Sequence, residues 1–128
     1  MRRRVTSGSN LEPEIGFSRA VRRGNLIAIS GTASIWEGAR TVGVGDVYSQ
    51  TKHCLAIVKA ALIEVDSCFE DVIRTRVMLT NVTTWREAAR AHGEAFGDIR
   101  PACTFVEVSR FIHPEWLVEI EVDAVTAE

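Results

Sequence analysis

The sequence predicts an α+β fold in which two helices cover one face of a single mixed β-sheet. Three observations carry this prediction: strand-like segments near both ends of the chain, two apolar stripes with helical spacing between them, and Gly, Pro and Asn at the segment boundaries. The predicted order is β-β-α-β-α-β-β, and elements in such an order pack as a helical layer on a sheet. We expect one domain spanning residues 1–128, because a chain of this length with 46% hydrophobic residues can build one core.

The first two strands are expected at residues 17–22 and 25–30. They are joined at "RGN", where Gly24 and Asn25 supply the positive φ that a tight hairpin requires. The basic residues that precede this hairpin, Arg2, Arg3 and Arg4, are interpreted as a solvated chain terminus.

Two helices are expected in the middle of the chain. After Asp46, apolar residues recur every three or four positions, which is typical of a long amphipathic helix, and Asp46 is placed to cap it. The second helix is predicted to begin at "TTWRE", where Thr84 and Glu87 have the spacing of a capping box. Its apolar face would comprise Trp85, Ala88, Ala89, His92 and Phe96. His92 is therefore interpreted as a core or interface histidine.

The remaining strands are "DVIRTRVMLTNV", "ACTFVEVSRF" and "WLVEIEVDAV". In the first of these, one side would carry Ile73, Thr75, Val77 and Leu79, and the other Arg74 and Arg76. In the last, Glu119, Glu121 and Asp123 alternate with apolar residues. The charged sides would form the sheet face that the helices leave uncovered. Phe105 and Val106 are neighbours whose apolar side chains point to opposite sides of their strand. We therefore expect the sheet face that the helices leave uncovered to pack against another subunit.

Composition narrows the classes of function. A net charge of −2 and a pI near 5.9 disfavour a nucleic-acid or anionic-membrane surface. No apolar run approaches the roughly 18 to 20 residues of a membrane-spanning helix, and no signal peptide is recognised. The three cysteines lack CxxC spacing and the three histidines lack metal-site spacing. These patterns predict a cytoplasmic protein with free thiols and no metal or cofactor.

Segments distributed over residues 6–126 resemble the Rid family, also called YjgF or, historically, the L-PSP endoribonuclease family. The resemblance rests on "GFSRAVRRGNLIAISG", "VIRTRVMLTNV", "AHGEAFGDIRPACTFVEVSR" and "LVEIEVDAV", and on the pairing of "RPAxTxVEV" with "EIE". It implies a chorismate-mutase-like fold. It also implies a homotrimer whose sheets face inward, with small-molecule clefts between neighbouring subunits.

The resemblance implies a hydrolytic site as well. In the deaminase branch of the family, an arginine after "PA" holds the carboxylate of a small 2-imino or enamino acid. The first glutamate of "EIE" positions the hydrolytic water, and the reaction releases ammonia and a 2-keto acid. In this chain that glutamate corresponds to Glu119, and the ligand-contacting residues of the "SG" turn correspond to Ser30 and Gly31.

Three ligand positions depart from the pattern of the deaminase branch. Cys103 stands where those relatives have the arginine, Phe17 where they have a tyrosine, and Ala89 where they have an asparagine. An arginine fork gives a carboxylate two charge-assisted hydrogen bonds, which a thiol does not replace. Losing about 3 kcal/mol weakens binding about a hundredfold. We therefore expect an imine or enamine substrate without the carboxylate handle.

Three classes of function compete at this stage. Glu119 and Ser30 favour a Rid-type hydrolase, whereas the missing polar contacts favour a trimeric ligand-binding or redox-sensing protein without turnover. An endoribonuclease is disfavoured by the acidic charge balance. Cys103 is interpreted as a pocket wall, a redox-sensitive thiol or a nucleophile. Glu119 either pairs with Arg74 or Arg76, or has a raised pKa in an apolar cleft and donates a proton to a leaving amine.

Overall fold

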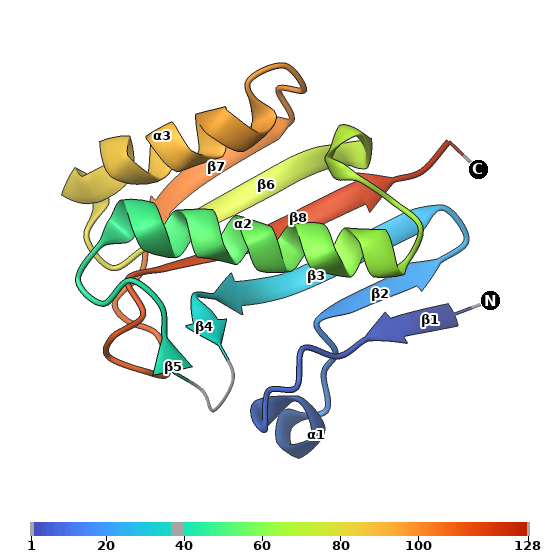
Figure 1. Ribbon diagram of the computed structural model, residues 1–128, viewed down its shortest axis with the longest axis horizontal. Coiled ribbons are helices and arrows are strands. Elements are labelled where there is room, and N and C mark those ends of the chain that lie inside the picture. Colours follow the sequence, from blue (N-terminus) through green and yellow to red (C-terminus); the bar gives the residue numbers. More distant parts are fainter. Residues whose placement is uncertain (1, 37–39, 128) are drawn as a thin grey trace.

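A computed structural model describes residues 2–36 and 40–127, and its centre is a six-stranded mixed sheet (Figure 1). The order across the sheet is β1-β2-β3-β8-β6-β7, and only the β6 and β7 pair is parallel among these neighbours. The six strands are β1 (Arg2–Val5), β2 (Ala20–Arg23), β3 (Leu26–Ala33), β6 (Val72–Leu79), β7 (Ala102–Glu107) and β8 (Val118–Val125). The predicted α+β class and its β-β-α-β-α-β-β core are confirmed, and β1 is an addition to that core.

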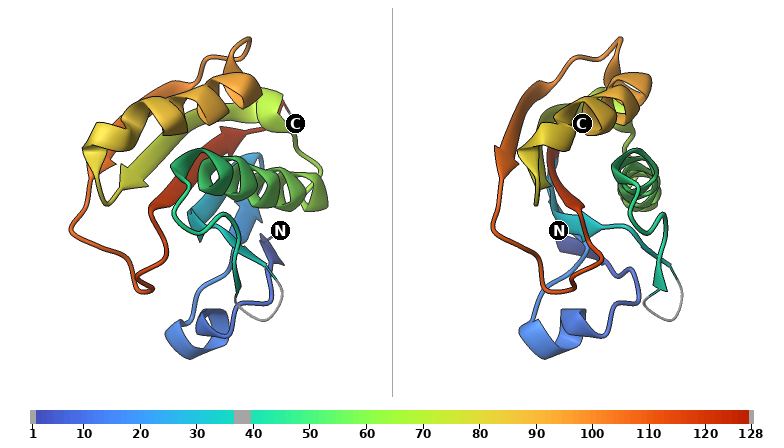
Figure 2. Two further views of the ribbon diagram at one scale, coloured as in Figure 1. Left: turned by 60° about the vertical axis from the view of Figure 1, so that its left-hand side comes forward. Right: turned by 90° about the vertical axis from the view of Figure 1, so that its left-hand side faces the viewer.

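The other elements are the helices and a small ribbon. They are α1 (Leu11–Ile15), β4 (Ile35–Trp36), β5 (Arg40–Thr41), α2 (Val47–Glu64), the 3₁₀ turns η2 (Phe69–Asp71) and η3 (Val82–Thr84), and α3 (Trp85–Phe96). Both long helices lie on the same face of the sheet, and Figure 2 shows that neither of them, nor any other helix or strand of the described residues, covers the other face. We call these the helix face and the open face. Within residues 2–36 and 40–127, no helix is long and apolar enough to cross a membrane.

Helix α2 packs its apolar stripe on β8 and β3, as its sequence period predicts. The buried residues of this stripe include Thr51, Cys54, Leu55, Val58, Ala61 and Leu62. They meet the inward side of β8, where Val118, Ile120 and Val122 are at most 1% exposed. The Asp46 side chain accepts a hydrogen bond from the Ser49 backbone N–H at 3.1 Å, so the predicted cap is confirmed.

The predicted hairpin turn is present, but the segment before it differs from the prediction. Gly24 has a φ of +62° in the turn between β2 and β3, but Asn25 does not have the positive φ that was also predicted for it. Strand β2 begins at Ala20 and not at residue 17. Helix α1 ends at Gly16, which has a left-handed conformation, and residues 17–19 connect it to the strand. The interpretation of Arg2 to Arg4 as a solvated terminus is wrong, since they form β1 along the edge of β2. Pairing satisfies backbone groups that a bare edge would leave open.

The start of α3 also corrects the sequence prediction. Thr84 makes no side-chain cap, and its hydroxyl instead donates to the Asn81 carbonyl at 2.7 Å. Asn81 accepts from the Thr83 backbone N–H and so begins the 3₁₀ turn η3 that leads into the helix. Trp85 at this junction is 43% exposed, whereas Ala88 and Phe96 are buried. The predicted capping box and the inward position of Trp85 are therefore wrong.

Strand β6 follows the predicted alternation except at its first residues. The register against β8 shifts between Val72 and Arg74, which turns Val72 inward and leaves Ile73 54% exposed. Ile73 is thus not on the apolar side, contrary to the prediction. Next to the buried Thr75, the His92 ring makes a 2.8 Å hydrogen bond with the threonine hydroxyl. Burial lowers the pKa of His92, in keeping with a neutral core histidine.

Phe96 and Trp85 provide a test of which residues of α3 support the core. Phe96 is 2% exposed and its ring contacts Phe69 and His92, so we expect Phe96→Ala to lower the free energy of unfolding by about 3–5 kcal/mol. Trp85→Ala on the same helix should change it by only about 0.5 kcal/mol. Urea denaturation followed by circular dichroism measures both. Equal losses would contradict the assignment of Trp85 to the surface.

Candidate functional site

The open face carries acids of β8 next to arginines of β6. Arg74 Nε lies 3.7 Å from Asp123 Oδ2, and Arg76 Nη1 donates to Glu121 Oε1. The third acid, Glu119, lies opposite Met78 and so has no arginine across the strand. Within residues 2–36 and 40–127, the Glu119 carboxylate makes no hydrogen bond or ion pair. The pairing of Glu119 with Arg74 or Arg76, which was one of its two interpretations, does not occur.

Gly31 borders the Glu119 carboxylate closely. The β3–β8 register shifts between Ile29 and Thr32, which places Gly31 in a β-bulge. A Cβ atom added to Gly31 would lie 2.6 Å from Glu119 Oε1, so only a glycine leaves this carboxylate where it is. The structure therefore brings Gly31 and Glu119 together, as the resemblance implies.

The environment of Glu119 favours its protonated form. Burial raises the pKa of this carboxyl group, the positive charge of Arg19 opposes that rise, and the negative charge of Glu121 adds to it. The direction agrees with the sequence-based expectation. A carboxyl group with a raised pKa exchanges protons nearer to neutral pH than an ordinary glutamate, which suits general acid and base catalysis.

Arg19, which the sequence analysis did not single out, lies at the centre of this region. It is only 5% exposed, and its guanidinium donates to Gly31 O at 2.7 Å, Ser30 Oγ at 3.0 Å and Thr32 Oγ1 at 3.1 Å. Its Nη2 lies 3.8 Å from the carboxylate of the buried Glu12. An arginine at a strand end is usually exposed, and its acidic partner lies in α1, which the sequence pattern did not predict. The pair was missed for these reasons.

Arg19 does not replace the missing carboxylate handle. Its Nε donates to Ser7 Oγ at 3.2 Å, and its Nη2 faces the buried Glu12 carboxylate. With only 5% of the residue exposed, the guanidinium is turned toward acceptors inside the protein. Its role is to hold the bulge of β3. Phe17 is near it, with the Arg19 Cζ 5.5 Å from the Phe17 ring centroid. A cavity of about 670 Å³ on this side is lined by residues that include Phe17 and Ser30.

Cys103 and Ala89 lie apart from that group within one chain. Cys103 pairs with Thr75 in the parallel β6–β7 ladder, so the two side chains point to the same side of the sheet. Thr75 is buried on the helix face, whereas Glu119 is on the open face. Cys103 is exposed, and Ala89 is half-buried on α3. One chain therefore brings together only Phe17, Ser30, Gly31 and Glu119 of the predicted site, while Ala89 on α3 and Cys103 on β7 lie outside that group.

A second, larger cavity of about 940 Å³ contains none of the predicted site residues. It lies between α2, β4 and the segments 7–11 and 112–116. Among the described residues, no three His, Cys, Asp or Glu side chains are grouped so that they could hold a metal ion.

Comparison with known proteins identifies the family. A sequence model of the family described as "Endoribonuclease L-PSP" matches residues 7–126. The chain belongs to the endoribonuclease L-PSP family. Its similarity to the uncharacterized protein SCO2049 of Streptomyces coelicolor is 40% identity over 122 residues, which is 95% of this chain and 90% of that protein. The resemblance to the Rid or YjgF family is confirmed.

Solved structures of the L-PSP family share the fold. The crystal structure of Rv2704 from Mycobacterium tuberculosis, a member of the YjgF/YER057c/UK114 family, has 40% identity and a TM-score of 0.90. The match covers 98% of this chain and 100% of that one. A third similar protein, from Acinetobacter baylyi, is named 3-aminoacrylate deaminase RutC. It is 29% identical over 108 residues, 84% of this chain and 85% of that protein.

Substitution of Arg19 tests its role in the fold. Arg19→Met leaves the Glu12 carboxylate buried without its cation, so we expect a loss of about 3–5 kcal/mol in the free energy of unfolding. Adding Glu12→Gln should recover part of that loss, and Arg23→Met at an exposed position of β2 should change stability by only about 0.5 kcal/mol. Chemical denaturation measures all three. Equal effects of Arg19→Met and Arg23→Met would refute a structural role for the buried guanidinium.

The pH dependence of stability tests the environment of Glu119. Because folding raises its pKa, the folded state holds this proton more tightly than the unfolded chain, whose glutamate pKa is about 4.3. Ionising Glu119 therefore lowers stability as pH rises from the unfolded pKa through the folded one. Relative to wild type, Glu119→Gln should gain stability at about pH 8 but not at about pH 3.5. Glu121→Gln, which loses a pair with Arg76, should show no such gain.

Proposed function

We propose that this protein hydrolyses small imine or enamine metabolites at clefts between subunits, with Glu119 as the acid and base group. The observation that carries the proposal is the state of Glu119: a half-buried carboxyl group with a raised pKa and no pairing partner, while both other acids on its strand are paired. An unpaired, half-buried carboxyl group lowers the stability of the folded protein. Its presence at this position therefore indicates a functional role.

The chemistry needs only water and one proton-transfer group. Water adds to the imine carbon and forms a C–O bond, while the Glu119 carboxylate accepts one proton of the water and passes it to the imine nitrogen, which gives a neutral carbinolamine. Glu119 then accepts the hydroxyl proton of the carbinolamine and donates it to the nitrogen, so that the C–N bond breaks and ammonia leaves as the carbonyl forms. The sum is R₂C=NH + H₂O → R₂C=O + NH₃. A carboxyl group with a pKa raised toward neutrality can perform both transfers.

The substrate class follows from the residues at the ligand positions. Phe17, Ala89 and Cys103 offer no charged group, and the Arg19 guanidinium is buried and turned toward Glu12 and β3. A substrate whose affinity depends on a bound carboxylate would therefore bind poorly. The similarity to the protein named 3-aminoacrylate deaminase supports enamine or imine chemistry. We infer that this chain acts on related compounds without the carboxylate handle.

A cleft between subunits accounts for the two-part arrangement of the site. Glu119 and Cys103 lie on opposite faces of one sheet, so a ligand that contacts both requires two chains. Strand β7 is at the free edge of the sheet, and most of its side chains are exposed on both faces. Partner subunits in a homotrimer would cover this strand and the open face.

Ligand binding without turnover is the alternative function. It is favoured by the same three residues, Phe17, Ala89 and Cys103, because none of them supplies the polar contact that would orient a substrate. Exposure of the Cys103 thiol also suits a redox-sensing role. In a ligand-binding or a redox-sensing protein, Glu119 would form a hydrogen bond with the ligand and would not take part in repeated proton transfer.

The test is ammonia release from enzymatically generated 2-iminopropionate, which carries the carboxylate. We expect wild type to be slow, and Cys103→Arg to raise kcat/KM by about a hundredfold because the fork restores about 3 kcal/mol of binding. Cys68→Arg, which adds the same side chain at another exposed cysteine, is the control and should have no effect. Adding Glu119→Gln to Cys103→Arg should abolish the gain.

Two outcomes would count against the proposal. High activity of wild type on 2-iminopropionate would show that the carboxylate is bound in another way. If Cys103→Arg binds the substrate analogue pyruvate but releases no ammonia from 2-iminopropionate, the ligand-binding alternative is favoured. Sedimentation of each variant establishes that its assembly is unchanged.

A further inference from the structure

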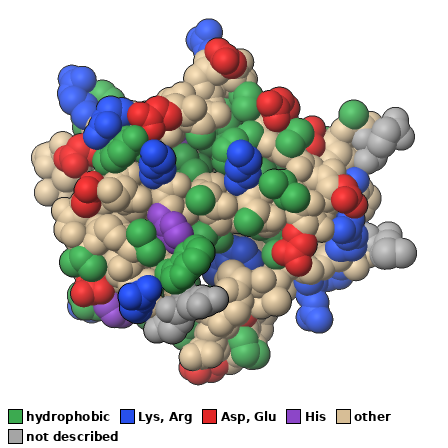
Figure 3. Space-filling view, in the orientation of Figure 1, with side chains coloured by type: hydrophobic (Ala, Val, Ile, Leu, Met, Phe, Trp, Pro, Cys, Tyr) green, Lys and Arg blue, Asp and Glu red, His purple; other side chains and the backbone are tan. Residues whose placement is uncertain are grey.

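One wall of the larger cavity is formed by residues of α2 that do not belong to the buried core. Besides its buried stripe, α2 has a second stripe at helical spacing, consisting of His53, Ala56, Ile57 and Ala60, and all four line this cavity. Ala56 and Ala60 are exposed and small, so they form a flat floor. In the orientation of Figure 1, the space-filling view in Figure 3 shows hydrophobic side chains gathered over this side of the molecule.

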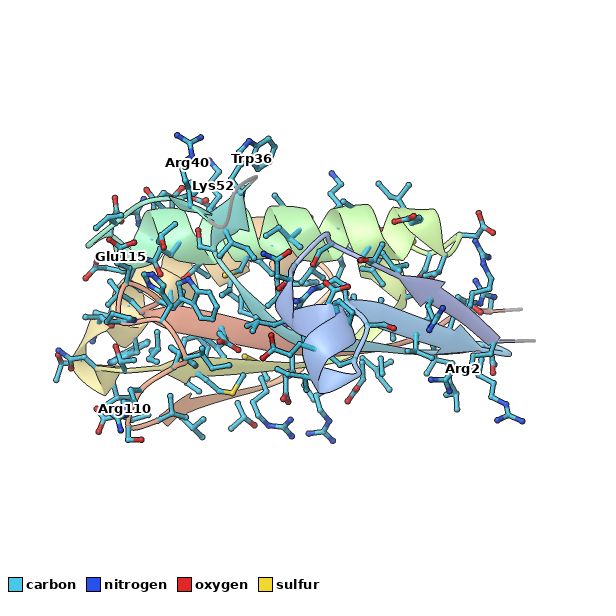
Figure 4. All side chains as sticks on the ribbon, turned by 90° about the horizontal axis from the view of Figure 1, so that it is seen from below. Arg2, Trp36, Arg40, Lys52, Arg110 and Glu115 are labelled. Carbon is cyan, nitrogen blue, oxygen red and sulfur yellow. The ribbon has the colours of Figure 1, made fainter. Side chains whose placement is uncertain are left out.

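Aromatic pairs stand on two sides of this floor. The Trp36 and His53 rings lie 5.6 Å apart between centroids, and the His113 and Trp116 rings are stacked, also at 5.6 Å. All four residues line the cavity. Figure 4 shows that Trp36 projects from the same side of the sheet as α2, away from the open face. We call the space lined by these rings and by the second stripe of α2 the aromatic cavity.

Hydrogen bonds hold the walls of the aromatic cavity in place. The fully buried Gln50 donates from Nε2 to the Glu115 carbonyl and accepts from the Leu117 backbone N–H, both at 2.9 Å. These two bonds attach the segment that carries Trp116 to α2. On the other side, His53 Nε2 makes a 2.9 Å hydrogen bond with the Ile35 carbonyl, which attaches β4 to the helix. The cavity is thus formed before any ligand binds.

The polar side chains that line the aromatic cavity include those of Ser7, Ser9, Asn10, His53, His113 and Trp116. His53 donates from Nε2 to a carbonyl, so its Nδ1 is left as an acceptor; His113 Nδ1 accepts from the Glu115 N–H, so its Nε2 is left as a donor. Among the lining residues that the structure describes, none is Asp, Glu, Lys or Arg. A charged ligand would lose its hydration here without gaining a partner of opposite charge.

We propose that the aromatic cavity is a second binding site, on the helix face, for an uncharged planar heteroaromatic molecule. Its volume of about 940 Å³ is in the range of about 300–1,000 Å³ that is usual for small-molecule sites. A flat ring can lie on the alanine floor with its faces or edges toward the tryptophan and histidine rings. The two free histidine nitrogens then select a ligand with a hydrogen-bonding ring atom. Nothing in this site depends on Glu119.

The three tryptophans make the site directly measurable. Trp36 and Trp116 line the cavity, whereas Trp85 is exposed at the start of α3 and serves as an internal reference. We expect titration with indole to shift the indole N–H signals of Trp36 and Trp116 in a ¹⁵N spectrum of the full chain. The shift should saturate with a Kd on the order of 0.1 mM for a ligand of this size, and Trp85 should not move.

Two probes and two variants define the specificity. Indole-3-acetate, which adds a carboxylate, and cyclohexanol, which is not planar, should each bind at least tenfold more weakly than indole. Ala56→Glu places a carboxylate on the floor and should also weaken indole binding at least tenfold. Ile63→Glu, at a 59% exposed position of α2 outside the lining, should leave it within about twofold.

The outcomes separate this proposal from its rivals and from the proposed hydrolase. Non-saturating shifts, or equal shifts of all three tryptophans, would overturn it as non-specific adsorption. Shifts of Trp36 and Trp116 that follow protein concentration and not indole would overturn it in favour of an interface between copies of the chain. Glu119→Gln should not change indole binding, and competition between indole and a substrate at Glu119 would show that the cavity is part of that site.

Discussion

The buried guanidinium of Arg19 is the interaction on which the candidate site depends. Its hydrogen bonds to Ser30, Gly31 and Thr32 hold the β3 bulge, and its proximity to Glu12 attaches the segment before β2 to the same point. At this bulge the absence of a side chain on Gly31 leaves room for the Glu119 carboxylate. Because the guanidinium is desolvated, it is stable only while its acceptors surround it. A structural ion pair and a candidate catalytic acid are therefore parts of one arrangement.

The sheet separates two environments that serve different purposes. Its helix face is covered by α2 and α3, whose buried residues form one core with the inward residues of β8. Its open face carries charge, and there two of the three β8 acids are neutralised by arginines of β6. Glu119 is the exception because its cross-strand neighbour is Met78. The unpaired acid lies beside the β3 bulge at Gly31, and an unpaired acid next to irregular backbone is the combination expected of a functional position.

The proposed site and the aromatic cavity differ in their chemistry. Around Glu119 the molecule has an acid with a raised pKa and a buried cation, which suits a reaction that moves protons. The aromatic cavity has rings and small side chains and, among its described lining residues, no Asp, Glu, Lys or Arg, which suits recognition of a flat molecule without reaction. Helix α2 contributes one stripe to the core and the other to the cavity. A ligand in the aromatic cavity would therefore contact the same helix that packs on β8, the strand that carries Glu119.

The fold class, the long helix α2 with its Asp46 cap, and the positions that correspond to a family site could be predicted from the sequence, because periodicity and turn residues act locally. The raised pKa of Glu119 was predicted as well. Three other features are visible only in the folded chain: Arg19 is buried beside Glu12, Trp85 faces solvent, and Ile73 is displaced by a bulge. The tertiary structure likewise placed Cys103 and Glu119 on opposite faces of the sheet. These features depend on contacts between residues far apart in the chain and on strand register, which short-range patterns do not encode.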